Sequence, residues 1–272
     1  MDIKFERYTF GKRLKSMLKV DFHRMFTAKL FYIMLGISFV VPILILVMTT
    51  MMDGSVSVNP QTGEETVIEA FDNAWQIIGT VSEEAASTDT AAISMDMMSM
   101  CNINLLYFGV AALVCIFTAE DFRSGYAKNL FTVRARKTDY VISKTLACTV
   151  GGALMILGFF IGTILGGAIA GLPFEMVRFG IGNVIMCLLS KMLLIAVFVP
   201  IYLLMSVIAK QKLWLSLLLS LMTGMFLFMM MPMLSPLNAT IINVILCIAG
   251  GVMLSTGLGA ISNQVLKKTS LV

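Results

Sequence analysis

A dense block of charged residues separates two long apolar stretches of this chain; its sequence, from Ala119 to Lys144, is AEDFRSGYAKNLFTVRARKTDYVISK. Only 13% of the chain is charged and 58% is apolar, so the block is unusual here. Side chains of this kind form ion pairs, hydrogen bonds and docking contacts. The single histidine, His23, excludes a His cluster, an H-E-x-x-H zinc motif and a His-dependent triad within this chain.

The block predicts a short, rigid, amphipathic elbow. Arg123 and the acids before it extend the preceding helix beyond the membrane, and Gly125 permits a sharp change of direction. The run from Tyr126 is long enough for about two helical turns, and Thr138 and Asp139 suit the cap and first turn of the next helix. Such an elbow suits docking into a groove of a soluble partner, although a basic loop that only enforces topology would carry the same charge. The candidate docking residues are Glu120, Asp121, Arg123, Gly125, Tyr126, Lys128, Asn129, Leu130, Arg134 and Arg136.

The remaining composition places the chain in the membrane class, since its mean hydropathy is strongly positive. Six apolar segments predict transmembrane helices, because irregular backbone cannot face lipid. The predicted fold class is all-α, a polytopic membrane protein whose six-helix transmembrane domain covers residues 30–272. The predicted spans are residues 30–52, 102–119, 145–170, 192–209, 214–231 and 240–261.

The distribution of charge along the chain predicts its orientation. Basic residues concentrate before the first span, within the block, at Lys210 and Lys212, and at the end of the chain. No Lys or Arg lies between Lys29 and Arg123, a stretch that contains the acidic loop 53–101. The positive-inside rule places both termini and the block in the cytoplasm and this loop outside, as in a multi-pass protein of the plasma (inner) membrane.

Residues 1–29 predict a cytoplasmic amphipathic helix at the membrane interface. Such a helix lies along the cytoplasmic leaflet with its apolar side inward and its cations toward lipid headgroups, so membrane lipid is an expected partner. A juxtamembrane anchor that only sets orientation is the simpler alternative. The predicted apolar face consists of Phe10, Leu14, Met17, Leu18, Phe22, Met25 and Phe26.

The acidic outer loop predicts more than a tether. A capping-box spacing begins at Thr62, and Ile68, Phe71, Trp75 and Ile78 follow at helical intervals. We expect a short amphipathic helix at the outer membrane surface. For its role we favour a lid packed over the outer helix ends, with no ligand of its own.

The position of Lys191 allows two interpretations. The run from Pro173 to Ser190 either continues into one very long fourth span, with Lys191 deep in the bilayer, or forms a separate outer interfacial or re-entrant helix, 174–190, with Lys191 at the outer boundary. An isolated buried ammonium costs about 3 kcal/mol or more, and no span offers an acidic partner. We therefore favour the second interpretation.

The predicted spans contain no Asp or Glu. A proton- or sodium-coupled carrier, a charged-ring channel filter and an intramembrane protease need such groups at membrane depth, so these classes are disfavoured. The five cysteines lie in or beside apolar runs, without the spacing of a disulfide framework or a metal site. We expect no metal centre and no cofactor on this chain, and no nucleic-acid partner.

Methionine and glycine are concentrated at particular places in the spans. Methionines cluster toward the outer side, where a soft apolar vestibule would suit amphipathic cargo, although helix-packing filler is the simpler explanation. Gly158, Gly162 and Gly166 recur every four residues in the third span, which favours close helix packing within the chain or at a subunit interface. The candidate substrate-path residues are Met48, Met51, Met98 and Met229.

The charged block resembles the coupling region of type-two ATP-binding-cassette (ABC) exporter permeases. The shared features are an acidic pair, an aromatic residue, Arg, a Gly before a short helix, and then Arg or Lys and "SK" before a new span. The run DFRSGYAKN is especially similar to a bacterial branch associated with export of, or immunity to, antimicrobial peptides such as lantibiotics. The basic helix before the first span and the large outer loop agree with this pattern.

This resemblance implies a permease subunit without its own motor, and the chain indeed has no G-x-x-x-x-G-K-[ST] loop. A separate cytoplasmic ABC ATPase, carrying ATP and Mg²⁺, would dock on a coupling helix between spans 2 and 3, within the segment 119–144. Two permeases, identical or paralogous, would pair. The implied function is export of a hydrophobic or amphipathic substrate, with a peptide as first choice, by a chain that is not itself an enzyme. The alternative is a membrane sensor or anchor that binds an outer ligand and recruits a cytoplasmic partner without transport.

Overall fold

The computed structural model describes residues 9–58, 65–67, 71–79, 102–133, 137–176, 179–209, 212–228 and 235–268. Within these ranges the chain is helical apart from one short antiparallel hairpin, β1 (Val56–Val58) with β2 (Glu65–Val67), and irregular connections. Two short 3₁₀ turns are η1 (Ala74–Ile77) and η2 (Ile103–Leu105). The α-helices are α1 (Phe10–Thr27), α2 (Lys29–Met51), α5 (Leu106–Arg123), α6 (Tyr126–Val133), α7 (Lys137–Ala170), α8 (Ile181–Ile208), α9 (Leu213–Phe228) and α11 (Ile241–Lys268).

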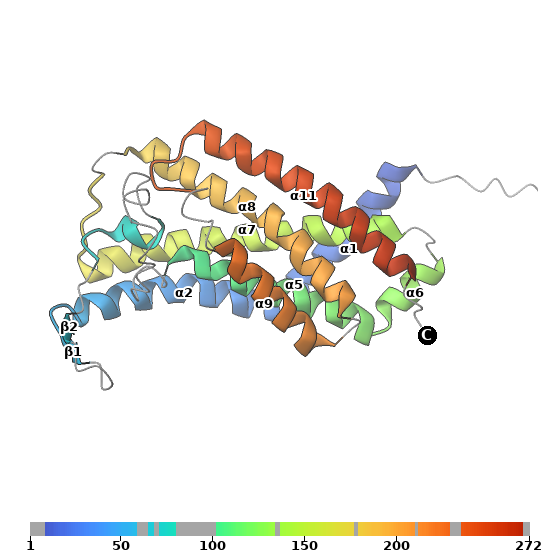
Figure 1. Cartoon of the computed structure of the whole chain (residues 1–272), viewed down its shortest axis with the longest axis horizontal. Helices are drawn as coiled ribbons and strands as arrows, with labels where there is room; N and C mark the ends of the chain where they lie inside the picture. Colours follow the sequence, from blue (N-terminus) through green and yellow to red (C-terminus); the bar gives the residue numbers. More distant parts are fainter. Residues whose placement is uncertain are drawn as a thin grey trace, which may run out of the picture.

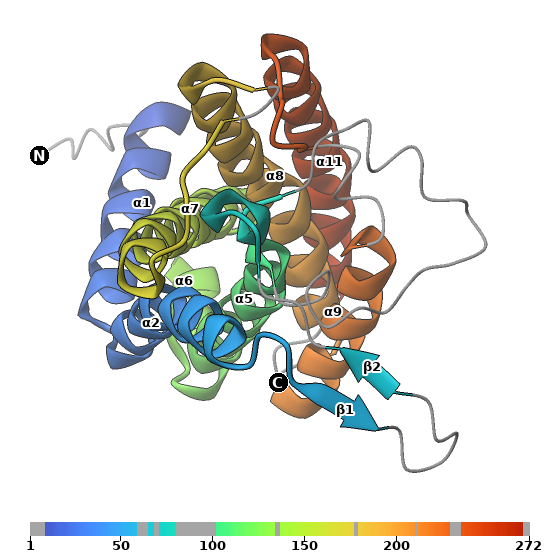
Figure 2. The same ribbon diagram turned by 90° about the vertical axis from the view of Figure 1, so that its left-hand side faces the viewer.

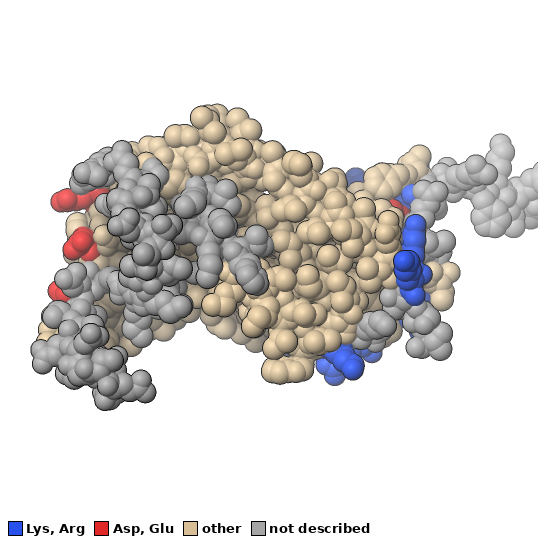
Figure 3. Space-filling view, viewed as in Figure 1, with Lys and Arg blue, Asp and Glu red and all other residues tan. Residues whose placement is uncertain are grey.

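The long helices form an elongated bundle with different elements at its two ends (Figure 1). The hairpin and η1 lie at one end, and α1 and α6 lie toward the other. On the face shown in Figure 3, most visible Asp and Glu gather at the first end and most visible Lys and Arg at the second. We call these the acidic end and the basic end. This separation is what the positive-inside pattern requires, while the orientation in a membrane stays a prediction.

Five helical segments are long and apolar enough to cross a membrane: α2, η2 with α5, α7, α8 and α11. The chain is therefore a multi-pass membrane protein. The sixth predicted span corresponds to α9, which is apolar but has only 16 described residues. The end of that predicted span, 229–231, lies outside the described residues, so the count of six stays a prediction.

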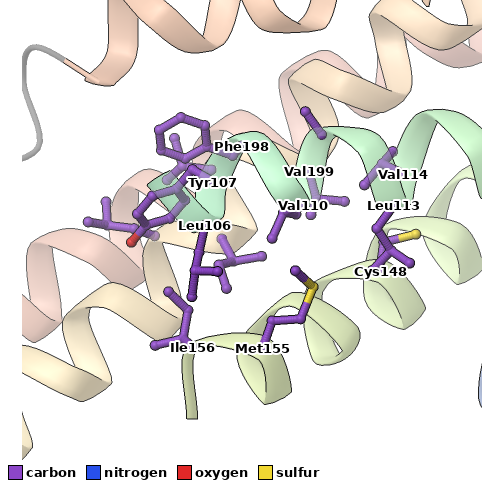
Figure 4. Close-up of a cluster of buried hydrophobic side chains, with 14 of the residues drawn as sticks. Leu106, Tyr107, Val110, Leu113, Val114, Cys148, Met155, Ile156, Phe198 and Val199 are labelled. Carbon is purple, nitrogen blue, oxygen red and sulfur yellow. The ribbon is translucent and has the colours of Figure 1, made fainter. Parts of the chain in front are cut away.

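Helix α5 lies at the centre of the bundle, and Figure 2 shows α2, α7, α8 and α9 around it. Its buried side chains meet those of α7 and α8 in one apolar core, drawn in Figure 4. Large apolar side chains are buried on this central helix but exposed along much of α2 and α11. Exposed apolar faces on long helices are typical of contact with lipid. The labelled core residues are Leu106, Tyr107, Val110, Leu113, Val114, Cys148, Met155, Ile156, Phe198 and Val199.

The glycines of α7 form a seam with α2. A Cβ atom on Gly162 would overlap the carbonyl oxygen of Phe39, and one on Gly166 would lie 2.8 Å from the Cα of Ile43. Only glycine allows the two backbones to approach this closely. The interpretation of this stripe as packing within the chain is confirmed.

The described parts of the segment between α2 and η2 differ from the helix that its spacing predicts. Glu65–Val67 is a strand, so the predicted amphipathic helix starting at Thr62 is wrong; Thr62 and Ile68 lie outside the described residues. Instead, the 3₁₀ turn η1 buries Trp75, whose ring stacks on Phe160 of α7 at a centroid distance of 6.1 Å. The local structure around Trp75 is therefore decided by its packing against α7 and not by the helical spacing of its apolar residues. The segment packs over the end of α7, as the lid interpretation predicts.

Helix α8 runs without a break from Ile181 to Ile208. The favoured interpretation of a separate helix over 174–190 is therefore wrong, and the described residues 172–176 are not helical. Lys191 lies about 15 Å along α8 from Ile181, at roughly 1.5 Å per residue, and its side chain is buried. It can lie there because polar side chains from other segments contact its ammonium, so it is not isolated.

Candidate functional site

The charged block folds as the elbow that its sequence predicts. Helix α5 ends at Arg123, and Gly125 then adopts a φ of 73°, a conformation that glycine tolerates without strain. The eight residues of α6 follow, and α7 begins at Lys137 with Asp139 in its first turn. The predicted two-turn helix, the sharp turn and the acidic first turn are confirmed.

The candidate docking residues differ in how much of each is exposed to solvent. Asp121 is 0% exposed and points into the protein. Gly125, Tyr126 and Leu130 are partly exposed. Arg134 and Arg136 lie outside the described residues. The exposed candidates, on the last turn of α5 and on α6, are Glu120, Arg123, Lys128 and Asn129.

Asp121 belongs to a cluster of four charged side chains that joins α1, α5 and α7. Lys144 Nζ of α7 lies 2.7 Å from Asp121 Oδ2 and 3.0 Å from Asp21 Oδ1 of α1. Arg24, one turn after Asp21 on the same face of α1, pairs with the other oxygen of Asp121. We call these four residues the ion cluster. Its two cations balance its two carboxylates.

Neighbouring polar and aromatic groups satisfy the ion cluster further. Tyr140 donates a hydrogen bond of 2.9 Å to Asp121 Oδ2, and the Ser143 hydroxyl donates to Asp21. Lys144 Nζ lies 3.5 Å from the centre of the Phe117 ring, within cation–π range. Buried charges persist when they are paired and hydrogen-bonded, and removing one partner costs about 3–5 kcal/mol. The cluster therefore fixes the position of α1 against the elbow.

Arg24 connects the ion cluster to α6. Its guanidinium carbon lies 4.1 Å from the centre of the Tyr126 ring, the first residue of α6. Burial lowers the pKa of Arg24, but the neighbouring Asp121 carboxylate outweighs burial, so the pKa of Arg24 is raised above its ordinary value. Burial, together with the charges of Asp21 and Asp121, also raises the pKa of Tyr126. The start of α6 is thus held by a permanently charged side chain.

Two further contacts attach the start of α7 to its surroundings. Arg13 Nε of α1 lies 3.0 Å from Asp139 Oδ2. Lys137 Nζ donates a hydrogen bond of 2.6 Å to the carbonyl oxygen of Leu266, in the last turn of α11. A cation at the C-terminal end of a helix also complements the helix dipole. The elbow is therefore linked to α1 and to the last helix.

Sequence reasoning missed three members of the ion cluster, Asp21, Arg24 and Lys144. A signal for Asp21 was present: it falls between Met17 and Met25 at four-residue spacing, on the predicted apolar face of α1, and all three are buried. An acid on an apolar stripe indicates a buried partner. Lys144 lies about two helical turns after Lys137 on the same face of α7, where an otherwise apolar run begins. The helix α1 is confirmed, whereas its contact with lipid stays a prediction.

A second polar group lies toward the acidic end, around Lys191. Lys191 Nζ lies 3.1 Å from Asn104 Oδ1 of η2 and 3.0 Å from Ser235 Oγ of the turn before α11. We call these three residues the Lys191 site. The Tyr107 hydroxyl, visible in Figure 4, donates a 2.8 Å hydrogen bond to the Lys191 carbonyl. The ammonium is 1% exposed, and both side-chain partners are neutral.

The remaining candidate groups give no assembled site among the described residues. Met48 and Met51 are exposed near the end of α2 that lies at the acidic end of the bundle, and Met98 and Met229 lie outside the described ranges. No group of three His, Cys, Asp or Glu side chains in the described part of the chain is placed to hold a metal ion. Four cysteines are buried as free thiols, as expected for packing residues: Cys115, Cys148, Cys187 and Cys247.

Comparison with known families gives the class of this protein. Residues 17–227, from α1 to α9, match a family described as ABC-2 family transporter protein. The chain belongs to this family. It is the membrane component of an ABC transporter, and such a component works with an ATPase subunit. No curated protein and no solved structure matches the chain.

Proposed function

We propose that this chain is the permease subunit of an ABC exporter that moves a hydrophobic or amphipathic substrate, with a peptide as first choice, across the plasma membrane. A separate cytoplasmic ATPase supplies ATP hydrolysis, and a second permease, identical or paralogous, completes the transporter. The bundle has six spans with its basic end in the cytoplasm. Family membership supports the class, and the similarity of DFRSGYAKN supports the antimicrobial-peptide export or immunity branch.

The elbow is the docking element for the ATPase. The observation that carries this assignment is an elbow whose exposed polar residues stand above buried ion pairs. Arg123 at the end of α5 and Lys128 and Asn129 of α6 are exposed, while Asp121 is held in the ion cluster. Moving a two-state equilibrium from 1:99 to 99:1 takes about 5.5 kcal/mol of differential binding. A flexible loop would dissipate part of that bias, whereas a base fixed by buried ion pairs transmits it. Asp121 thus acts on coupling by holding the elbow and not by touching the ATPase.

The contacts at the base define how motion passes from the ATPase to the spans. A displacement of α6 acts on α5 through Gly125 and on α1 through Arg24 and Tyr126. The bond from Lys137 to the Leu266 carbonyl carries the same displacement to the end of α11. Helices α1, α5, α7 and α11 therefore respond together when the ATPase docks on α6.

Association with the ATPase tests the docking assignment. Charge reversal in Arg123→Glu/Lys128→Glu is expected to lower the amount of ABC ATPase that co-purifies with the tagged chain by at least about tenfold, a loss of about 1.4 kcal/mol. Gly125→Pro is expected to do the same, because proline cannot adopt a φ of 73°. The matched control, Lys15→Glu/Lys19→Glu, makes the same charge change on exposed residues of α1. Normal co-purification by both elbow variants, with normal membrane insertion, would contradict the assignment.

Transport separates the exporter from the sensor or anchor. Inverted membrane vesicles that contain the permease and its ATPase should accumulate an apolar peptide only when ATP is present. Binding of the peptide without ATP-dependent accumulation would favour the sensor. Loss of accumulation in the Arg123→Glu/Lys128→Glu variant ties the movement to the elbow.

A further inference from the structure

The Lys191 site holds a buried cation without a countercharge among the described residues. Its ammonium contacts the amide oxygen of Asn104 and the hydroxyl of Ser235. The other polar groups near it are the hydroxyl of Tyr107, which bonds the Lys191 carbonyl, and the thiols of Cys187 and Cys247. An ammonium has three donors and no acceptor, so the two side-chain contacts leave donor capacity as well as charge.

The cost of such an arrangement indicates a role beyond packing. A cation within a membrane span is expensive and marks a functional position by default. A methionine of similar length would fill the same space without desolvating a charge. The elements around Lys191 are α8, η2, the turn at Ser235, α5 through Tyr107 and α11 through Cys247, and the contacts of their described residues bring no carboxylate to the ammonium.

We infer that Lys191 recognises an acidic group on the transported molecule, such as the C-terminal carboxylate of an amphipathic peptide. This inference rests on the proposed function and adds a substrate class to it. An arriving carboxylate replaces the neutral oxygens of Asn104 and Ser235 on the ammonium, because a charge-assisted hydrogen bond is roughly twice as strong as one with a neutral partner. Asn104 and Ser235 accept hydrogen bonds from the ammonium in the absence of substrate, and the substrate carboxylate replaces them when it binds.

The two neutral partners lie outside the long helices. Asn104 lies in the short 3₁₀ turn η2, and Ser235 lies in the non-helical connection before α11, whereas Lys191 is fixed in a continuous helix. Asn183 Nδ2 and the Ala239 carbonyl join the same connection to α8 at 3.1 Å. Displacing Ser235 from Lys191 therefore loosens this turn at the acidic end, where exported cargo leaves.

Binding of a matched pair of peptides tests the inference. The probes are two apolar peptides of one sequence, each labelled at the N-terminus with a neutral fluorophore, one with a free C-terminal carboxylate and one with a C-terminal amide. The full chain is reconstituted in phosphatidylcholine nanodiscs. The wild type is expected to bind the carboxylate form about tenfold more tightly. Lys191→Gln keeps a polar side chain without the charge and is expected to bind both forms equally.

The control variant is Lys212→Gln, which removes an exposed lysine at the start of α9; it is expected to keep the tenfold preference. Ser235→Ala serves where Lys191→Gln does not fold, and removal of the competing hydroxyl is expected to tighten binding of the carboxylate peptide several-fold. The inference is overturned if the wild type binds the two peptides equally or binds neither. It is also overturned if Lys191→Gln keeps the preference, or if Ser235→Ala binds the carboxylate peptide no more tightly than the wild type does. ATP-driven accumulation of the amide peptide in vesicles would show that the proposed function stands even where the inference fails.

Discussion

Two buried lysines in neighbouring helices have opposite electrostatic surroundings. Lys144 of α7 and Lys191 of α8 are 0% and 1% exposed. Lys144 pairs with the carboxylates of Asp21 and Asp121 and rests on an aromatic ring. Among the described residues, the side-chain contacts of the Lys191 ammonium are the neutral oxygens of Asn104 and Ser235. The first lies near the basic end of the bundle and the second toward the acidic end.

This difference teaches that burial alone does not define what a charged side chain does. A cation neutralised by fixed carboxylates gains little from a ligand, so Lys144 is a structural tie between α1, α5 and α7. A cation with neutral partners keeps an attraction for an incoming anion. The comparison predicts that the two lysines respond differently to the same substitution.

The largest effect is expected for Lys144→Met. This change leaves Asp21 and Asp121 buried, with Arg24 as the remaining cation of the ion cluster, and it should lower the free energy of unfolding by about 3–5 kcal/mol. Thermal unfolding of the purified chain in detergent, followed by size-exclusion chromatography, measures it. Lys144→Met/Asp21→Asn restores the charge balance and should recover about 1–3 kcal/mol through the coupling of the pair. Additive losses in the double variant would contradict the ion cluster.

A smaller effect is expected for Arg24→Gln. Asp121 keeps Lys144 and the Tyr140 hydroxyl, and the Arg24 side chain is 25% exposed, so the loss should be about 1–3 kcal/mol. The contact with Tyr126 is also lost, and co-purification of the ATPase should fall together with stability. The exposed Lys29 offers a control in Lys29→Gln. Equal stability and equal co-purification of the ATPase in Arg24→Gln and Lys29→Gln would show that Arg24 does not connect the ion cluster to α6.

The smallest effect on stability is expected for Lys191→Met. Removing a desolvated charge offsets the loss of its two contacts with Asn104 and Ser235, so the net change should lie within about 1 kcal/mol. The same unfolding assay measures it beside Lys144→Met. If Lys191→Met lowers the free energy of unfolding as much as Lys144→Met does, the proposed difference between the two lysines is wrong.

The elbow could be predicted from sequence because its signals are local. Gly125 marks the turn, the run from Tyr126 marks a two-turn helix, and Asp139 marks the first turn of α7. The glycine stripe of α7 was also readable, since four-residue spacing places small residues on one face. Each of these features is determined by the backbone propensity and periodicity of residues that lie close together in the sequence.

The ion cluster and the Lys191 site depend on contacts that are distant in the sequence. Asp21 and Lys144 are separated by the whole of α2, α5 and α6, and Ser235 lies 44 residues from Lys191. Periodicity shows which face a residue shares but not which helix meets that face. The expectation of an outer helix failed for the same reason, since the packing of Trp75 on α7 decides the local structure.

The seam between α2 and α7 restricts how a substrate can enter. Gly162 lies so close to Phe39 that not even a methyl group fits between the two backbones. A lipid tail or a peptide side chain cannot pass through such a contact. In the proposed transport cycle, a substrate that enters sideways from the bilayer would therefore pass between other pairs of helices.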